Sequence, residues 1–178
     1  MRIYTRTGDD GKTFCAALGG RVSKASVMIE LVGALDEAST SVGVARAFCE
    51  ERGCPRGIVE LLEEAQRMLF LVGFAISGSR DFSGDEISRL EEAIDRLMQG
   101  IELKGFILPG GTPESSLIHL ARTAVRRAER RFFAALEQGA IQGGERASYA
   151  GRLLNRLSDA LFAAAVRIEH DRGALRYV

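Results

Sequence analysis

The chain has 178 residues, which fits a single domain that can bury a full hydrophobic core. Its 24 basic residues balance 24 acidic ones, so no general attraction to nucleic acid or to an anionic membrane is expected. Three cysteines are too few for a disulfide framework and are interpreted as reduced thiols. The chain begins without a signal-peptide-like apolar run and has none long enough to span a bilayer, so we expect a cytoplasmic protein.

The first half of the chain predicts a loop followed by two helices. Residues 1–23 are polar, hold four glycines and lack a helical period, which indicates an irregular loop. A first helix is expected from Ser23 or Lys24 to Cys49, where apolar side chains recur at helical spacing. A second helix should cover about 57–77. Because residues 68–76 are apolar nearly all round, we expect that half of the helix to be deeply buried.

Capping signals mark the helices of the second half. The pattern Ser83-Gly-Asp-Glu86 is typical of a capping box and predicts a third helix that ends near Gly100. Thr112-Pro113 supplies an N-cap residue and a proline at the first helical position, which predicts a fourth helix that continues to about Gln138. A fifth helix is expected over about 145–169.

Five long helices with short connections, and no strand of useful length, predict an all-α fold built as an antiparallel bundle. We expect a single domain over residues 1–178, with the irregular N-terminal loop at 1–23 and the bundle over 24–170. The alanines of the fourth and fifth helices suit close helix packing, although alanine is also simply a good helix former.

The fourth helix holds the densest group of positive charges. Arg122, Arg126 and Arg130 recur at every fourth position and therefore share one face, close to Glu129. Guanidinium groups match the oxygens of phosphates and carboxylates in bidentate fashion, so this face is a candidate anion site. The spacing alone also fits a solvated face or a ladder of ion pairs to a neighbouring helix.

Polar side chains interrupt the apolar runs of two other helices. Asn155 can both donate and accept hydrogen bonds, as the edge of adenine requires, or it can order helix packing. Asp36 needs a basic partner, for which an arginine of the fourth helix is the obvious candidate, and such a pair fits a structural role equally well. His119 and His170 have no second ligand at metal-binding spacing and are interpreted as ordinary helix residues.

The N-terminal sequence TRTGDDGKT at residues 5–13 is a candidate phosphate cradle. Its glycines let backbone N–H groups approach an anion, and its hydroxyls and cations add further donors. The segment is not a Walker A loop, because Arg6 stands near the position of that motif's first glycine and no strand is expected before it.

Six segments stand out in combination. They are TRTGDDGKT near the start, GGRVSK at 19–24, GALDE at 33–37, FILPGGT at 106–112, ARTAVRRAERR at 121–131 and LNRLSD at 154–159. Together, and in this order, they resemble the trimeric ATP:corrinoid adenosyltransferases. The family usually has Lys where this chain has Arg6 and Asp10, its GGERVSK stretch has a Glu that is absent here, and the spacing from Thr13 to Lys24 is one residue longer here.

The resemblance implies a five-helix bundle that assembles as a homotrimer and binds ATP, with magnesium held mainly by the nucleotide, between adjacent subunits. Asp36 and Arg122 resemble the intersubunit ion pair of the family. Phe106 resembles the aromatic residue on the corrinoid side that favours cobalt without its lower axial ligand. The implied ATP contacts come from the N-terminal loop and from the fourth and fifth helices: Thr5, Arg6, Thr7, Gly8, Thr13, Lys24, Arg126, Arg127, Glu129, Arg130 and Asn155.

The implied reaction is attack of cob(I) on C5′ of ATP, which gives adenosylcobalamin and triphosphate. It needs orientation and charge stabilisation rather than a protein nucleophile, and Arg126, Arg130, Lys24 and magnesium suit the second task. Phe106 would ease the preceding reduction of cob(II). The alternatives are a bundle that holds ATP or cobalamin without catalysis and a purely structural bundle. A corrinoid reductase and an adenosylcobalamin-dependent enzyme are the expected protein partners.

Overall fold

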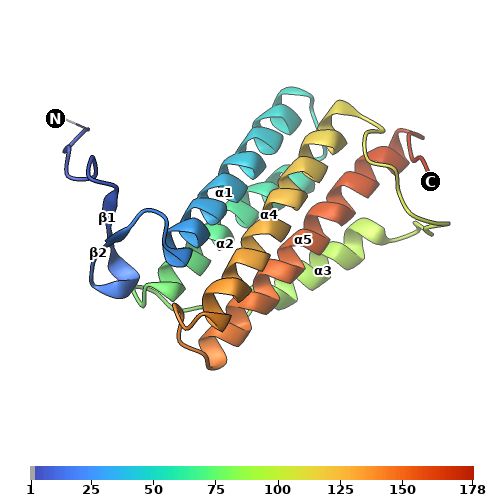
Figure 1. Ribbon diagram of the computed structural model, residues 1–178. Coiled ribbons are helices and arrows are strands. Elements are labelled where there is room, and N and C mark those ends of the chain that lie inside the picture. The colour runs from blue at the N-terminus through green and yellow to red at the C-terminus, as the bar shows by residue number, and fades with distance from the viewer. Residues whose placement is uncertain (1–2) are drawn as a thin grey trace.

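Five long helices account for most of the computed structural model, which describes residues 3–178 (Figure 1). The all-α five-helix fold predicted from the sequence is confirmed. The helices are α1 (Val27–Glu51), α2 (Arg56–Ile76), α3 (Glu86–Met98), α4 (Pro113–Glu137) and α5 (Glu145–Asp171).

Helices that follow one another along the chain run in opposite directions (Figure 1). α1 packs against α2 and α4, and α5 packs against α4, α3 and α2. The connections at 77–85 and 99–112 are longer than the short loops that we expected. The N-terminal segment projects from one end of the bundle, whereas the loop 99–112 lies at the other end beside the C-terminus.

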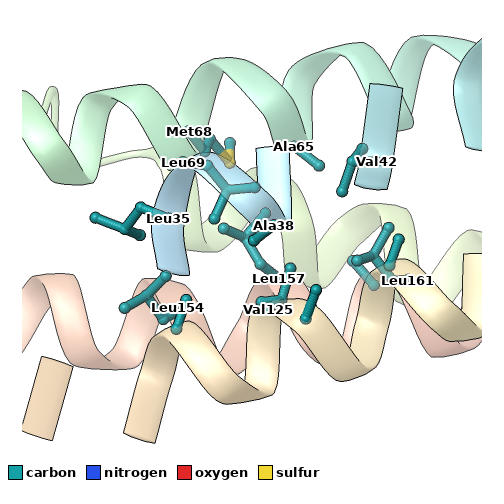
Figure 2. Packing of buried hydrophobic residues seen from close by; sticks show 14 of the residues in the cluster. Leu35, Ala38, Val42, Ala65, Met68, Leu69, Val125, Leu154, Leu157 and Leu161 are labelled. Carbon is teal, nitrogen blue, oxygen red and sulfur yellow. The ribbon is translucent and has the colours of Figure 1, made fainter. Parts of the chain in front are cut away.

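The core forms because each helix presents apolar side chains at positions three and four apart. Leu35, Ala38 and Val42 of α1 meet Met68 and Leu69 of α2 across the bundle axis (Figure 2). Val125 of α4 and the α5 residues Leu154, Leu157 and Leu161 close the same cluster from the other side. Burying a side chain of this size contributes about 1.5–3 kcal/mol each, so this cluster is the main source of bundle stability.

Small residues let α4 and α5 approach closely. A Cβ atom on Gly151 would lie 2.9 Å from Cζ of Phe133, so the ring of Phe133 packs directly on the α5 backbone at this point. The expected close packing of the alanines is confirmed, because these alanines of α4 and α5 are buried: Ala121, Ala124, Ala128, Ala160, Ala163, Ala164 and Ala165.

The second half of α2 was expected to be deeply buried, which is correct for one face of the helix and wrong for the other. Met68, Leu69 and Val72 face the core, but Phe70 and Phe74 are 57% and 45% exposed. The reason is geometric, because positions two apart on a helix point to nearly opposite sides. Both rings line a groove that the hairpin segment 14–17 also borders.

A short β-hairpin precedes α1, which we did not predict. β1 (Lys12–Cys15) pairs antiparallel with β2 (Gly20–Ser23). A 3-10 turn over Ala16–Leu18 joins them and ends at Gly19, whose φ of 64° favours glycine. Because Gly20–Ser23 are committed to this ladder, α1 begins at Val27 rather than at Ser23 or Lys24.

The capping signals were correct for α4 and partly wrong for α3. Thr112 accepts a hydrogen bond from the Ser115 N–H, and the Thr112 N–H donates to the Ser115 hydroxyl, so this capping box is complete. Glu86 accepts from the backbone N–H of Ser83, but the N-cap residue is Asp85 and α3 begins at Glu86. No helix within residues 3–178 is long and apolar enough to cross a membrane.

Candidate functional site

The arginines of α4 divide into two groups. Arg127 forms an ion pair with Glu37, and Arg131 pairs with Glu30 at 3.1 Å, so both are directed toward α1. Arg126 and Arg130 are exposed and have no carboxylate partner among the described residues. The ion pairs to α1 are therefore formed by Arg127 and Arg131 and not by the face of Arg122, Arg126 and Arg130 for which a ladder was considered. Anion binding by Arg126 and Arg130 stays a prediction.

On the side of α4 that faces α5, Glu129 accepts a hydrogen bond from the Asn155 amide at 3.1 Å. Asn155 is exposed, so it does not serve packing inside the core. Glu129 and Asn155 therefore lie next to the exposed guanidinium groups of Arg126 and Arg130. An amide, a carboxylate and two cations on one surface offer both donors and acceptors to a polyanionic nucleotide.

Arg122 and Asp36 are not paired with each other within the chain. Arg122 lies with its guanidinium carbon 5.7 Å from the ring centroid of Phe162, and its buried Nε has no hydrogen-bond partner in the described chain. Burial lowers the pKa of Arg122, and the neighbouring charge of Arg126 lowers it further. The prediction that Asp36 pairs with an arginine of α4 fails within one chain, where Glu37 and Glu30 take the α4 arginines instead.

Asp36 lies instead in an apolar groove of about 530 Å³ between the hairpin, α1 and α2. The exposed rings of Phe14, Phe70 and Phe74 line this groove, and Asp36 is the one charged residue among its lining side chains in the described chain. One weak signal for this groove was present in the sequence, because Phe70 and Phe74 are four residues apart and lie on the face of α2 opposite to its core residues.

The hairpin organises the N-terminal segment. Arg21 of β2 donates to the carboxylate of Asp10 at 2.7 Å and to the backbone oxygen of Thr7. The Lys12 N–H donates to Asp10, and this hydrogen bond, with help from Arg21, lowers the pKa of Asp10 despite the opposing effect of desolvation. Asp10 therefore stays ionised and ties the loop to the hairpin.

The predicted loop donors lie close to one another on this frame. The ammonium of Lys24 approaches Gly8 so closely that a Cβ there would lie 3.1 Å from it. The hydroxyls of Thr5 and Thr7 are 2.8 Å apart, and Arg6 between them has a φ of 61°. Thr13 stands in β1, opposite Val22. The hydroxyls of Thr5 and Thr7 thus lie together in the exposed N-terminal segment, and the ammonium of Lys24 reaches the same segment at Gly8.

Phe106 lies in the loop between α3 and α4 and is 87% exposed. It therefore does not act as a lid on the core of its own chain, and its projection from a bundle end is confirmed. The N-terminal segment lies at the opposite end of the bundle from this loop (Figure 1). One chain by itself does not bring the predicted phosphate donors and Phe106 together.

A buried polar cluster lies beneath the loop of Phe106, and the sequence interpretation missed it. Glu169 of α5 accepts a hydrogen bond from the Ser115 hydroxyl at 2.7 Å, and His119 lies 3.8 Å from the same carboxylate oxygen. His119 is 4% exposed; burial lowers its pKa, although the charge of Glu169 opposes that effect. The one sequence signal was a glutamate near the end of the apolar fifth helix.

The described residues contain neither a cluster of metal ligands nor a disulfide. Among residues 3–178 no group of three or more His, Cys, Asp or Glu side chains is arranged to hold a metal ion. The three cysteines are free and buried. Burial raises the pKa of Cys49 to about 12, with a further contribution from Cys54, so this thiol is not a nucleophile at neutral pH.

A family model described as cobalamin adenosyltransferase matches residues 3–168. The chain belongs to this family. A corrinoid adenosyltransferase of Bacillus subtilis is 40% identical, over 98% of this chain and 90% of the relative. The corrinoid adenosyltransferase PduO of Salmonella typhimurium is 38% identical over 96% of this chain, which spans 51% of that longer relative.

The fold of the chain is also similar to solved structures of corrinoid adenosyltransferases. A variant PduO-type ATP:corrinoid adenosyltransferase from Lactobacillus reuteri, complexed with cobalamin and ATP, has a TM-score of 0.85 to this chain. The two are 28% identical, and the match covers 99% of this chain and 96% of the other. The family resemblance of the sequence motifs is therefore confirmed along the whole described chain.

Proposed function

We propose that the protein transfers the 5′-deoxyadenosyl group of ATP to the cobalt of a reduced corrinoid, which makes it a corrinoid adenosyltransferase. The observation that carries this conclusion is the family match over residues 3–168, together with the full-length likeness to a structure complexed with cobalamin and ATP.

The reaction is a displacement at the C5′ atom of ATP. The electron pair of cob(I) forms the cobalt–carbon bond, the bond between C5′ and its oxygen breaks, and triphosphate leaves with that electron pair. No proton has to be moved by a side chain. The protein must therefore orient C5′ over cobalt and stabilise the charge that develops on the leaving group.

We assign the triphosphate to the N-terminal segment and the exposed arginines of α4. Magnesium would be bound mainly by ATP itself. The contacts from the N-terminal segment would come from Thr5, Arg6, Thr7, Gly8, Thr13 and Lys24. Arg126 and Arg130 are available because no carboxylate of the described chain neutralises them. Arg127 is paired with Glu37 and would support α1 against α4. Glu129 and Asn155 would meet the nucleoside.

We propose that this site is completed by a second copy of the chain, in a homotrimer. Two observations support it. The N-terminal segment, with its predicted phosphate contacts, and the loop that carries Phe106 lie at opposite ends of one bundle. Among residues 3–178, the buried Nε of Arg122 has no hydrogen-bond partner and Asp36, in its apolar groove, has no basic partner. A neighbouring subunit that pairs the two would satisfy both groups.

On the corrinoid side we propose that Phe106 packs against the corrin face where a lower axial ligand would bind. Its nearly complete exposure leaves the ring available for such a contact. Exclusion of the ligand would make cob(II) easier to reduce. A corrinoid reductase that supplies the electron and an enzyme that consumes adenosylcobalamin follow as partners, in the cytoplasm, where three free thiols are stable.

The function is tested by anaerobic absorbance spectroscopy with chemically reduced corrinoid and ATP. The spectrum of the alkylcobalt product should develop with the protein and should not develop with ADP-ribose in place of ATP. ATP binding without any such product would mean that the chain is a non-catalytic binding bundle.

A further inference from the structure

The loop that carries Phe106 is attached to the C-terminal tail on one side. The Val178 N–H donates to the backbone oxygen of Phe106 at 3.0 Å, and the Leu108 N–H donates to the oxygen of Arg176 at 2.9 Å. Ile107 and Tyr177 form an isolated antiparallel bridge between these hydrogen bonds. These hydrogen bonds join the loop to the C-terminal tail. By themselves they do not attach either segment to the helices of the bundle.

A buried carboxylate attaches the end of this loop to the bundle, whereas Arg167 holds its start through the backbone oxygens of Leu97 and Gln99. Glu169 of α5 is 0% exposed, and its Oε1 accepts from the Gly111 N–H at 3.1 Å and from the Ser115 hydroxyl at 2.7 Å. The backbone oxygen of Glu169 accepts from the Ala174 N–H at 2.7 Å. One residue thus holds the end of the loop, the first turn of α4 and the start of the tail.

The backbone at Gly111 is in close contact with the Glu169 side chain and with the C-terminal tail. A Cβ on Gly111 would lie 2.4 Å from the oxygen of Ala174 and 3.0 Å from the Cγ and Cδ of Glu169. Such contacts do not occur in real proteins, so the loop passes between the Glu169 side chain and the tail only because residue 111 is glycine. By contrast, a Cβ on Gly105 would meet nothing closer than 3.8 Å.

Burial of the Glu169 carboxylate costs desolvation free energy. An apolar side chain would pack without desolvation cost, but it would leave the Gly111 N–H without its acceptor and the Ser115 hydroxyl with only the Thr112 oxygens, at 3.0 Å and 3.1 Å. The nearest cation-forming group is His119 at 3.8 Å, while Arg172 is engaged by Glu114 at 2.9 Å. The loop and cap donors of Glu169 therefore satisfy its Oε1, whereas its Oε2 is buried without a hydrogen-bond partner among the described residues.

We propose that Glu169 is a positioning residue for the reaction, which holds the loop 105–111 so that Phe106 is presented to the corrinoid. This inference rests on the proposed function of Phe106. In this proposal Glu169 does not contact ATP or the reacting atoms. Its effect on turnover is transmitted through the loop alone.

The test compares Glu169→Leu with Glu169→Gln. Gln keeps an oxygen acceptor at the same place, whereas Leu fills similar space without one. Amide hydrogen exchange should show that residues 105–111 lose about tenfold protection in Glu169→Leu, as removal of about 1.4 kcal/mol of anchoring predicts. Glu169→Gln should stay within about threefold of the unmodified chain, because both donors keep an acceptor. Equal exchange in all three proteins would overturn the proposal.

The same variants are assayed for turnover from cob(II) with a reductant and from preformed cob(I), with ATP affinity measured by calorimetry. Glu169→Leu should reproduce Phe106→Ala: a larger loss from cob(II), a smaller one from cob(I), and unchanged ATP affinity. Combined with Phe106→Ala it should add no further loss from cob(II). Additive losses, or normal turnover from cob(II) while Phe106→Ala is impaired, would overturn the positioning role.

Gly111→Ala and Gly105→Ala form a second matched pair in the same loop. Gly111→Ala should raise exchange at 105–111 and impair turnover from cob(II), whereas Gly105→Ala should do neither. Equal behaviour of the two would contradict the anchor. If Phe106→Ala itself turned over normally from cob(II), the proposed role of Phe106 would fail, and the exchange data would still decide whether Glu169 holds the loop.

Discussion

Arg126→Ala and Arg131→Ala each remove one guanidinium from α4, yet we expect opposite outcomes. Arg131 pairs with Glu30 at 3.1 Å, with side chains 47% and 54% exposed. An exposed pair of this kind contributes less than about 1 kcal/mol to stability and offers no free charge to a ligand. Arg126 is exposed without a carboxylate partner in the described chain, so its charge is available to the leaving triphosphate.

The size of the effect follows from the charge that develops on the triphosphate. Loss of one charged donor aimed at that charge costs about 2–4 kcal/mol of transition-state stabilisation. The turnover number of Arg126→Ala should therefore fall by about 30-fold to 10³-fold. Arg131→Ala should stay within about twofold, since its partner is a side chain of α1 and not the substrate.

The assay is the initial rate of adenosylcobalamin formation from preformed cob(I) at saturating ATP, with circular dichroism to verify the fold of each variant. Preformed cob(I) removes the reduction step, so the rate reports on adenosyl transfer. Similar rates for the two variants, or a greater loss in Arg131→Ala, would refute the division of the α4 arginines into paired and ligand-binding groups.

Three further outcomes are expected. Phe106→Ala should lose more turnover from cob(II) than from cob(I) without a change in ATP affinity, and equal losses would assign Phe106 to the fold. Asp36→Asn should weaken subunit association by at least about tenfold, because Arg122 would lose a charged acceptor worth about 1.4 kcal/mol or more; sedimentation that is unchanged across a dilution series would contradict this. Burial alone would raise the pKa of Glu86, but hydrogen bonds from Ser83 and Tyr149 outweigh it and lower the pKa from 4.5 to about 2. Its stabilising effect, at most about 3 kcal/mol, should be complete above pH 4.5 and lost as the pH falls toward 2, and Glu86→Gln should flatten the acid limb of a denaturation series.

The parts of the fold that depend on local signals were predictable. The cap at Thr112 places a side-chain acceptor and a proline within four residues, so α4 begins where the sequence predicts. The hairpin was missed because its stability comes from pairing Lys12–Cys15 with Gly20–Ser23, a contact that neither strand signals alone. The exposure of Phe70 and Phe74 also depends on which elements pack against α2, and that is decided by the whole bundle.

The roles of the candidate site residues stay predictions, but the structure shows which arginines of α4 are paired and which are not. Spacing placed Arg122, Arg126 and Arg130 on one face, but it could not tell that Arg127 and Arg131 would be taken by carboxylates of α1. The Glu169 anchor joins groups that are distant in sequence, Gly111 and Ser115 among them. Such a contact exists only after α5 has packed beside the start of α4.

The measurement that tests adenosyl transfer most directly is the stoichiometry of its two products. The protein is mixed anaerobically with chemically generated cob(I) and a known amount of ATP, and adenosylcobalamin and inorganic triphosphate are quantified in the same sample. Displacement at C5′ predicts one triphosphate for each cobalt–carbon bond formed. The rate at which both products form should be much lower in Arg126→Ala. Release of ADP or AMP without adenosylcobalamin, or no product at all from a folded protein that binds ATP, would contradict the assignment.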